Sequence, residues 1–187
     1  IYAEDFVRSL TFIIDEGPKV RIKDFIFDGT FSRPQKYYIA FMFDHSGEVV
    51  GRKLFNSEEI ETGVKNLVTE LQNQGFIASK IPGTRIDFSK SRDAVVIKVT
   101  LDEGPQTFID RIVFKGLYNV PREEIESAIG LKANLPLQLS LLEESTAHLL
   151  ELYRSKGYLE ARLFNSEKSI VTYSADNTKA TLTFDIQ

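Results

Sequence analysis

The side chains that could support acid–base catalysis or metal binding are few and scattered along the chain. They are two histidines, His45 and His148, and two acidic pairs, Glu58-Glu59 and Glu143-Glu144. Each pair falls in the first turn of an expected helix, where the helix dipole favours negative charge. We expect His148 on the surface of a helix and His45 in a turn, so neither is predicted to bind a metal.

The sequence also lacks the motifs that catalysis or cofactor binding would need. It contains no cysteine, so it has neither a disulfide framework nor a thiolate metal ligand. A phosphate-binding glycine loop, a His-Glu-x-x-His motif and a Gly-x-Ser-x-Gly motif are absent as well. No nucleophile and base occur in a recognisable constellation. We therefore expect no enzymatic activity, no metal and no cofactor.

Composition argues against two further classes of function. The 187 residues carry a net charge of −4, and no segment has the basic excess of a nucleic-acid-binding domain or of a lipid-binding surface. No apolar run approaches the roughly 20 residues that span a bilayer as a helix. The chain begins inside an expected strand and ends on another, so we expect a fragment of a longer protein.

An internal repeat organises the chain. Asp15-Glu16-Gly17-Pro18 recurs 87 residues later as Asp102-Glu103-Gly104-Pro105. Each copy precedes a similar strand, Ile22–Gly29 in the first case and Ile109–Gly116 in the second. A fixed period with matching strand and turn chemistry indicates tandem modules. We predict a terminal strand of a preceding module at 1–17, a first module at 18–104 and a second at 105–187, with hinges at Gly17, Pro18, Gly104 and Pro105.

The first module reads as β-α-α-β-β. A strand at 21–27 is followed by a helix that starts near Ser32 and ends at His45, and by a loop to about Lys53. A second helix opens at Asn56 or Ser57 and ends at Gly75, a residue suited to a helix C-terminus. Strands are expected at 76–81 and 94–101, separated by a polar turn at 89–93. The last strand alternates strictly, with these residues on one face: Val95, Ile97, Val99 and Leu101.

The second module repeats the order with shorter pieces. Its strands are expected at 110–114, 158–164 and 180–186, and its helices at 121–129 and from Ser140 to Gly157. Glu143 follows Ser140 at the spacing of a capping box. A polar turn at 174–179 precedes the last strand. Inward-facing positions of this module are expected to be Ile112, Phe114, Leu142, Leu149, Leu152, Tyr153, Leu182, Phe184 and Ile186.

This order of elements restricts the topology. Two antiparallel helices return the chain to the end where it left the first strand, so the second strand runs antiparallel to the first. A short turn then lets the third strand pair with the second and lie parallel to the first. The prediction is an α+β fold with two three-stranded mixed sheets of order 1-3-2, each covered on one face by two antiparallel helices. Pro82 favours an edge position for the second strand, because proline is confined to sheet edges and bulges.

An edge strand can pair with an extended segment of another chain. The partner-binding edge of the second module is predicted at Tyr158, Leu159, Glu160, Ala161, Arg162, Leu163 and Phe164, and that of the first at Phe76, Ile77, Ala78, Ser79 and Lys80. Leu159, Ala161 and Leu163 are expected to face the helices. Because the second edge lacks proline, it is the better docking edge. In the alternative interpretation, both are ordinary protected edges, with Glu160 and Arg162 as gatekeepers.

The RNA-binding KH fold shares the β-α-α-β order and is a competing interpretation. It needs a Gly-x-x-Gly loop between the two helices to hold the nucleic-acid backbone. Gly47 and Gly51 are one residue too far apart, and the second module has only Gly130 in that region. The acidic balance argues against it as well.

The ordered set of motifs resembles the tandem POTRA (polypeptide-transport-associated) domains of BamA/TamA-like outer-membrane assembly and translocation factors. The motifs are Asp-Glu-Gly-Pro, a strand Ile-x-x-Phe/Ile-x-Phe-x-Gly, a helix ending in Leu/Tyr-x-x-x-Gly-Phe/Tyr, and a hairpin. The resemblance covers residues 18–187, with 1–16 as a remnant. The longer stretch at 43–53 between the helices departs from the pattern, which puts any partner site carried over to that stretch in doubt.

The resemblance implies a protein-binding arm on the periplasmic face of the outer membrane of a Gram-negative bacterium. It implies capture of unfolded outer-membrane proteins by strand addition and docking of accessory lipoproteins or periplasmic chaperones. It implies contact with the membrane only through a barrel that is not in this sequence, and no nucleic acid. The alternative is a structural docking scaffold or spacer whose partners bind helix faces or loops. An Ala161→Pro variant should separate the two functions. Substrate capture should fail in this variant if strand addition is correct, and should survive if the chain is a docking scaffold.

Overall fold

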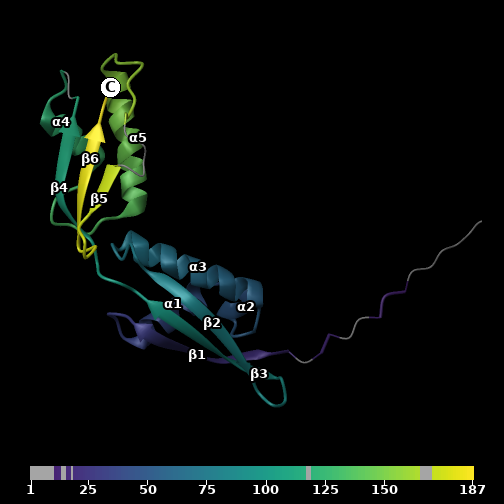
Figure 1. Ribbon diagram of the computed structural model, residues 1–187. Coiled ribbons are helices and arrows are strands. Elements are labelled where there is room, and N and C mark those ends of the chain that lie inside the picture. The colour runs from purple at the N-terminus through teal and green to yellow at the C-terminus, as the bar shows by residue number, and fades with distance from the viewer. Residues whose placement is uncertain (1–10, 14–15, 18, 117–118, 165–169) are drawn as a thin grey trace, which may run out of the picture.

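The first module is built from three strands and three helices. The computed structural model describes residues 11–13, 16–17, 19–116, 119–164 and 170–187 (Figure 1). The elements of the first module are β1 (Arg21–Thr30), α1 (Gln35–His45), α2 (Glu48–Gly51), α3 (Ser57–Asn73), β2 (Lys80–Phe88) and β3 (Ala94–Asp102). Asn56 caps α3, because its side chain accepts a hydrogen bond from the Glu59 backbone N–H.

The second module has the same order without the extra helix. Its elements are β4 (Phe108–Lys115), α4 (Arg122–Ile129), α5 (Leu139–Ser155), β5 (Val171–Tyr173) and β6 (Lys179–Asp185). Gly130 ends α4 in the left-handed conformation, at φ 65°. No helix in the described part of the chain is both long enough and apolar enough to cross a bilayer.

The two sheets have the predicted topology. Their strand orders are β1-β3-β2 and β4-β6-β5, so the last strand of each module lies in the centre. It runs parallel to the first strand and antiparallel to the second, as the pairs Phe27 with Val99 and Ile86 with Ile97 illustrate. The predicted α+β fold with two mixed sheets of order 1-3-2 is therefore confirmed.

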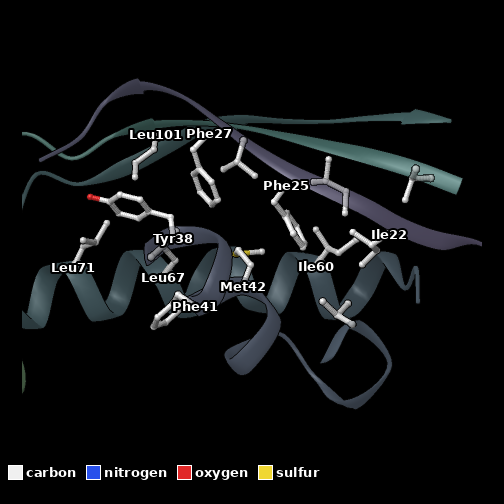
Figure 2. Packing of buried hydrophobic residues seen from close by; sticks show 14 of the residues in the cluster. Ile22, Phe25, Phe27, Tyr38, Phe41, Met42, Ile60, Leu67, Leu71 and Leu101 are labelled. Atoms are coloured by element: carbon white, nitrogen blue, oxygen red, sulfur yellow. The ribbon is translucent and has the colours of Figure 1, made fainter. Parts of the chain in front are cut away.

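The core of each module lies between the sheet and its helices. In the first module, the alternating face of β3 is fully buried and meets Phe25 and Phe27 of β1 on the same side. Figure 2 shows Phe25, Phe27 and Leu101 on the sheet facing the side chains of α1 and α3, which include Tyr38, Met42 and Leu67. Burying one such side chain stabilises a fold by roughly 1.5–3 kcal/mol. The core of the second module is a separate cluster that includes Ile109, Leu149, Leu182 and Phe184.

Three local predictions are wrong. The stretch at 43–53, predicted as a loop beyond His45, contains the one-turn helix α2. The capping box at Ser140 does not form, because α5 begins one residue earlier, after Gln138, and no side chain caps it. Residues 11–13, predicted as part of a strand, have no regular structure, and the rest of that predicted strand lies outside the described residues.

The modules meet at the C-terminal end of α3. The Thr107 backbone N–H donates to the Gly75 carbonyl at 2.7 Å, and the Gln106 side chain donates to the Gln74 carbonyl at 2.8 Å. The Ser140 N–H, at the start of α5, lies 3.4 Å from the Asn73 side-chain oxygen. Figure 1 shows the second module beyond this end of α3. We refer to these contacts as the module joint.

Candidate functional site

The first strand of each module is partly covered along its outer edge. The segment before α3 bonds to the start of β1, with the Ile22 N–H donating to the Lys53 carbonyl at 2.8 Å. The segment before α5 does the same for β4, with the Ile109 N–H donating to the Leu135 carbonyl at 2.8 Å. The outer edges of β2 and β5 have no such covering segment among the described residues.

The backbone of β5 directs some of its hydrogen-bonding groups away from the sheet. Val171, Thr172 and Tyr173 pair with Leu182, Thr181 and Ala180 of β6, and the Ser174 N–H donates to the Lys179 carbonyl at 2.9 Å. Backbone groups in an antiparallel pair point alternately toward the partner strand and away from it. Because Ser174 bonds inward, Thr172 also bonds inward, and the N–H and C=O groups of Val171 and Tyr173 point away from β6.

A mainly apolar groove of about 350 Å³ lies between β5 and α5. Val171 and Tyr173 line it from the strand, because residues of a strand that are two apart share a face. Their cross-strand neighbours, Leu182 and Ala180, are buried in the core below. Burial raises the pKa of the Tyr173 hydroxyl above the ordinary tyrosine value. The groove is lined from the helix by Leu139, Leu142, Glu143 and Thr146.

The β2 edge is longer but obstructed. Pro82 lies within the strand, beside a bulge between Lys80 and Gly83, which confirms the predicted edge position of this proline. Lys80 forms an ion pair with Asp102 at 3.3 Å. Asp87 accepts hydrogen bonds from Arg85 and Lys98, which lower the pKa of its carboxyl group. A missing N–H, a bulge and charged side chains are features that disfavour pairing with another strand.

The predicted edge strand at 158–164 is wrong in its first half. Gly157, at φ 95°, ends α5, and the chain then turns, with the Ala161 N–H donating to the Tyr158 carbonyl at 3.1 Å. Arg162 exchanges two backbone hydrogen bonds with Gln187, both 2.9 Å long, and the Phe164 N–H donates to the Asp185 carbonyl. Only the last three residues of the predicted strand, 162–164, therefore lie beside the end of β6.

The side chains of this segment agree only partly with the prediction. Ala161 is buried and Leu163 packs against the core, as expected. Leu159 is 77% exposed, although it was expected to face the helices, because it lies in the turn before pairing with β6 begins. Glu160 and Arg162 line a second cavity near the end of β6.

The predicted edge of the first module is also displaced. Phe76 is buried, and the Ser79 N–H donates to the Phe76 carbonyl at 3.0 Å, so residues 76–79 form a turn rather than a strand. Ile77 packs against the core of the second module, and Ala78 lies against Gly104. Of the five residues predicted for this edge, only Lys80 belongs to β2.

The predicted hinge at Gly104 and Pro105 follows a buried carboxylate. Glu103 is only 2% exposed, and its two oxygens accept hydrogen bonds from the Ser32 N–H at 2.6 Å and the Tyr38 hydroxyl at 2.7 Å. Burial, together with this hydrogen bond, raises the pKa of Tyr38 to about 12. Gly104 has φ 68°, and Gly17 in the first copy of the motif has φ 59°. Pro18 lies outside the described residues, and hinge motion at these sites stays a prediction.

Sequence reasoning missed Val171, Thr172 and Tyr173. Two signals were available: these residues are β-branched or aromatic, and they directly precede the polar turn at 174–179. The histidines lie apart from this edge, since the His45 ring stacks on Phe41 and His148 is exposed on α5. Among the described residues, no three histidine, cysteine or acidic side chains lie close enough together to hold a metal ion.

Residues 107–187 match the POTRA family model, described as a surface antigen variable number repeat. The matched residues are those of the second module. The match begins at Thr107, the residue that donates to Gly75 at the module joint. No curated protein sequence matches the chain.

Solved structures show that both modules together have the fold of tandem POTRA domains. POTRA domains 3–5 of Haemophilus influenzae BamA align with 91% of this chain at a TM-score of 0.54 and 12% sequence identity. BamA from Haemophilus ducreyi lacking POTRA domains 1–3 aligns with 89% of it at a TM-score of 0.59 and 14% identity. The chain spans 61% and 29% of the lengths of these two structures.

Proposed function

We propose that this chain is a non-enzymatic periplasmic binding arm of an outer-membrane protein assembly or translocation factor. In this proposal it captures extended segments of unfolded outer-membrane proteins by adding them as a strand to the β5 edge. The observation that carries the proposal is an edge whose outward backbone groups, at Val171 and Tyr173, lie beside an apolar groove. The POTRA match and the likeness to the BamA fold support the proposal that the chain is part of an outer-membrane assembly or translocation factor.

The geometry of β5 fits an incoming strand with alternating apolar residues. Val171 and Tyr173 each offer one N–H and one C=O, and the net gain of about 1 kcal/mol per hydrogen bond is offset by the entropy lost on association, so the backbone alone gives only weak affinity. Apolar side chains that enter the groove above Leu142 would add to this affinity. Barrel strands of outer-membrane proteins alternate in the required way. We therefore expect weak, reversible binding with little side-chain specificity.

The test is an NMR titration of the full chain with an extended peptide of alternating apolar residues. We expect amide shifts at Val171 to Tyr173 and at the α5 residues that line the groove. Tyr173→Pro removes one outward N–H and should abolish the shifts. Tyr173→Thr keeps the N–H and removes the ring, so it is the matched variant and should only weaken binding.

A structural docking scaffold is the alternative function. Shifts confined to the exposed faces of the helices or to the loops would support it and overturn strand addition at β5. So would unchanged binding in the Tyr173→Pro variant, provided that its spectrum shows an intact fold. Accessory lipoproteins or periplasmic chaperones are the partners proposed for such faces.

A further inference from the structure

Among the described residues, the groove beside β5 has one charged side chain on its wall. Glu143 lies on α5 and is exposed at the rim of the groove, whereas Leu142 next to it is only 7% exposed. The Thr146 hydroxyl donates to the Leu142 carbonyl at 3.0 Å, so its proton is already used. The remaining side chains that line the groove are uncharged: Leu139, Leu142, Ile170, Val171 and Tyr173. The groove therefore presents an apolar wall with a single carboxylate.

The Glu143 carboxylate has no ion-pair or hydrogen-bond partner within the described part of the chain. On a helix, a basic residue three or four positions away could pair with it. Those positions hold uncharged residues, which are Leu139, Ser140, Thr146 and Ala147. By contrast, Glu124 of α4 pairs with Lys156 at 2.6 Å. The negative charge beside β5 is therefore available to a group that enters the groove.

A strand added to β5 would place every second side chain in this groove. The N–H and C=O groups of Val171 and Tyr173 point away from β6, so they are the groups that would pair with it. Residues directly opposite each other in paired strands lie on the same face of the sheet, about 5 Å apart. Because Val171 and Tyr173 line the groove, the residues opposite them would enter it as well. The residues between these positions would lie on the other face of the sheet.

We propose that Glu143 makes the β5 edge select extended segments that carry a lysine or arginine among their groove-facing residues. This inference rests on the strand addition proposed above and names the class of segment that it favours. The cation would pair with the Glu143 carboxylate, while apolar residues on the same face would cover Leu142 and Val171. An acidic residue at the same positions would be repelled. Backbone pairing gives little side-chain specificity, so this charge preference would rank the segments that bind.

The experiment is a position scan along the extended peptide, measured by NMR titration of the full chain. Each position of the peptide is occupied in turn by lysine and by glutamine, and the ratio of the two affinities is the readout. We expect lysine to bind about two- to fivefold more tightly at alternate positions, and this gain to disappear at about 0.5 M salt. An equal ratio at every position would reflect only the net charge of −4 and would overturn the proposal.

Two variants assign the preference to one carboxylate. Glu143→Gln keeps the size of the side chain and should bring the ratio to one at every position, with the glutamine peptides bound as before. Glu144→Gln is the matched control, because this residue is exposed in the same two turns of α5 and lies outside the groove. It should preserve the alternating ratio.

The outcomes separate this inference from the proposed function. An alternating ratio that persists in Glu143→Gln, or that is lost in Glu144→Gln, would contradict the role of Glu143. Binding at the β5 amides with a ratio of one throughout the scan would overturn the charge preference alone. Absence of binding by every peptide would overturn strand addition at β5 and the preference with it.

Discussion

The second strands of the two modules occupy the same place in the sheet and differ in what they offer to a partner. β2 is nine residues long, contains Pro82 and a bulge, and carries the ion pairs of Lys80 and Asp87. β5 is three residues long and lies beside an apolar groove. If strand addition occurs at β5 as proposed, the chemistry along an edge matters more for it than the length of the edge.

The largest predicted effect is the loss of stability when a core phenylalanine is truncated. It tests whether the two modules are separate folding units, which the comparison of their second strands assumes. Phe27 and Phe184 are buried in different cores, and Phe→Ala in a core costs about 3–5 kcal/mol. Phe184→Ala should destabilise the second module and leave the β2 hairpin of the first unaffected, and Phe27→Ala should do the reverse. Residue-resolved hydrogen exchange in urea measures this. Equal loss of protection in both modules would show a single cooperative unit.

The next largest effect is a loss of stability when the buried carboxylate of Glu103, in the first module, is removed. Glu103→Ala leaves the Ser32 N–H and the Tyr38 hydroxyl without their acceptor, and should cost about 1–3 kcal/mol. Chemical denaturation of the first module measures this loss. Lys80→Ala, which removes an exposed ion pair of the same module, is the control and should change stability by under about 1 kcal/mol.

The same cluster predicts a difference in alkaline stability. Tyr38 has a pKa of about 12 in the folded protein, above the value of 10.0 for an unperturbed tyrosine. A raised pKa means that its contribution is complete below pH 10 and is lost as the pH rises through 12. The first module should therefore lose stability between pH 10 and 12, and Tyr38→Phe should remove that dependence. Unchanged alkaline sensitivity in this variant would refute the assignment.

A smaller effect, on peptide binding, is expected when the obstructing residues of the β2 edge are replaced so that it resembles the β5 edge. Pro82→Thr with Asp87→Thr restores an N–H and removes a charge from the edge. We expect peptide binding to β2 to rise by about fivefold, since the restored N–H adds one hydrogen bond worth about 1 kcal/mol. NMR titration measures the binding, and Glu61→Thr, which removes an exposed negative charge from α3, controls for the change in net charge. No gain would mean that the groove beside β5, rather than the open backbone, dominates binding.

The smallest effect lies in the turn that sets the register of β5. Hydrogen bonds from Ser174 and Thr178 lower the pKa of Asp176 to about 2. A lowered pKa means that the stabilisation is present above about pH 4 and is lost as the pH falls through 2. Amide protection at Thr178 should decrease over that range, and Asp176→Asn should make it independent of pH there. The first hairpin, with Asp93 in a similar cluster, should behave in the same way.

The topology could be predicted from the internal repeat, and the central strands could be predicted from their alternating apolar residues. Val95, Ile97, Val99 and Leu101 alternate without interruption, and burial requires that pattern. The run at 158–164 alternates as well, but a hairpin strand must reach its turn, and this run ends ten residues before Ser174. The strand next to the turn therefore had to lie near 171–173. The contact of Glu103 with Tyr38 spans 65 residues and depends on the tertiary fold, so no local pattern contains it.

The position of Glu103 has a consequence for how the chain is made and divided. This residue follows the last residue of β3, yet its side chain completes the interior of the module before it. During synthesis, the hydrogen bonds to Ser32 and Tyr38 can form only after Glu103, which lies beyond the last strand of the sheet, has appeared. A recombinant first module that stops at the last residue of β3 would lack the acceptor for the Ser32 N–H and the Tyr38 hydroxyl.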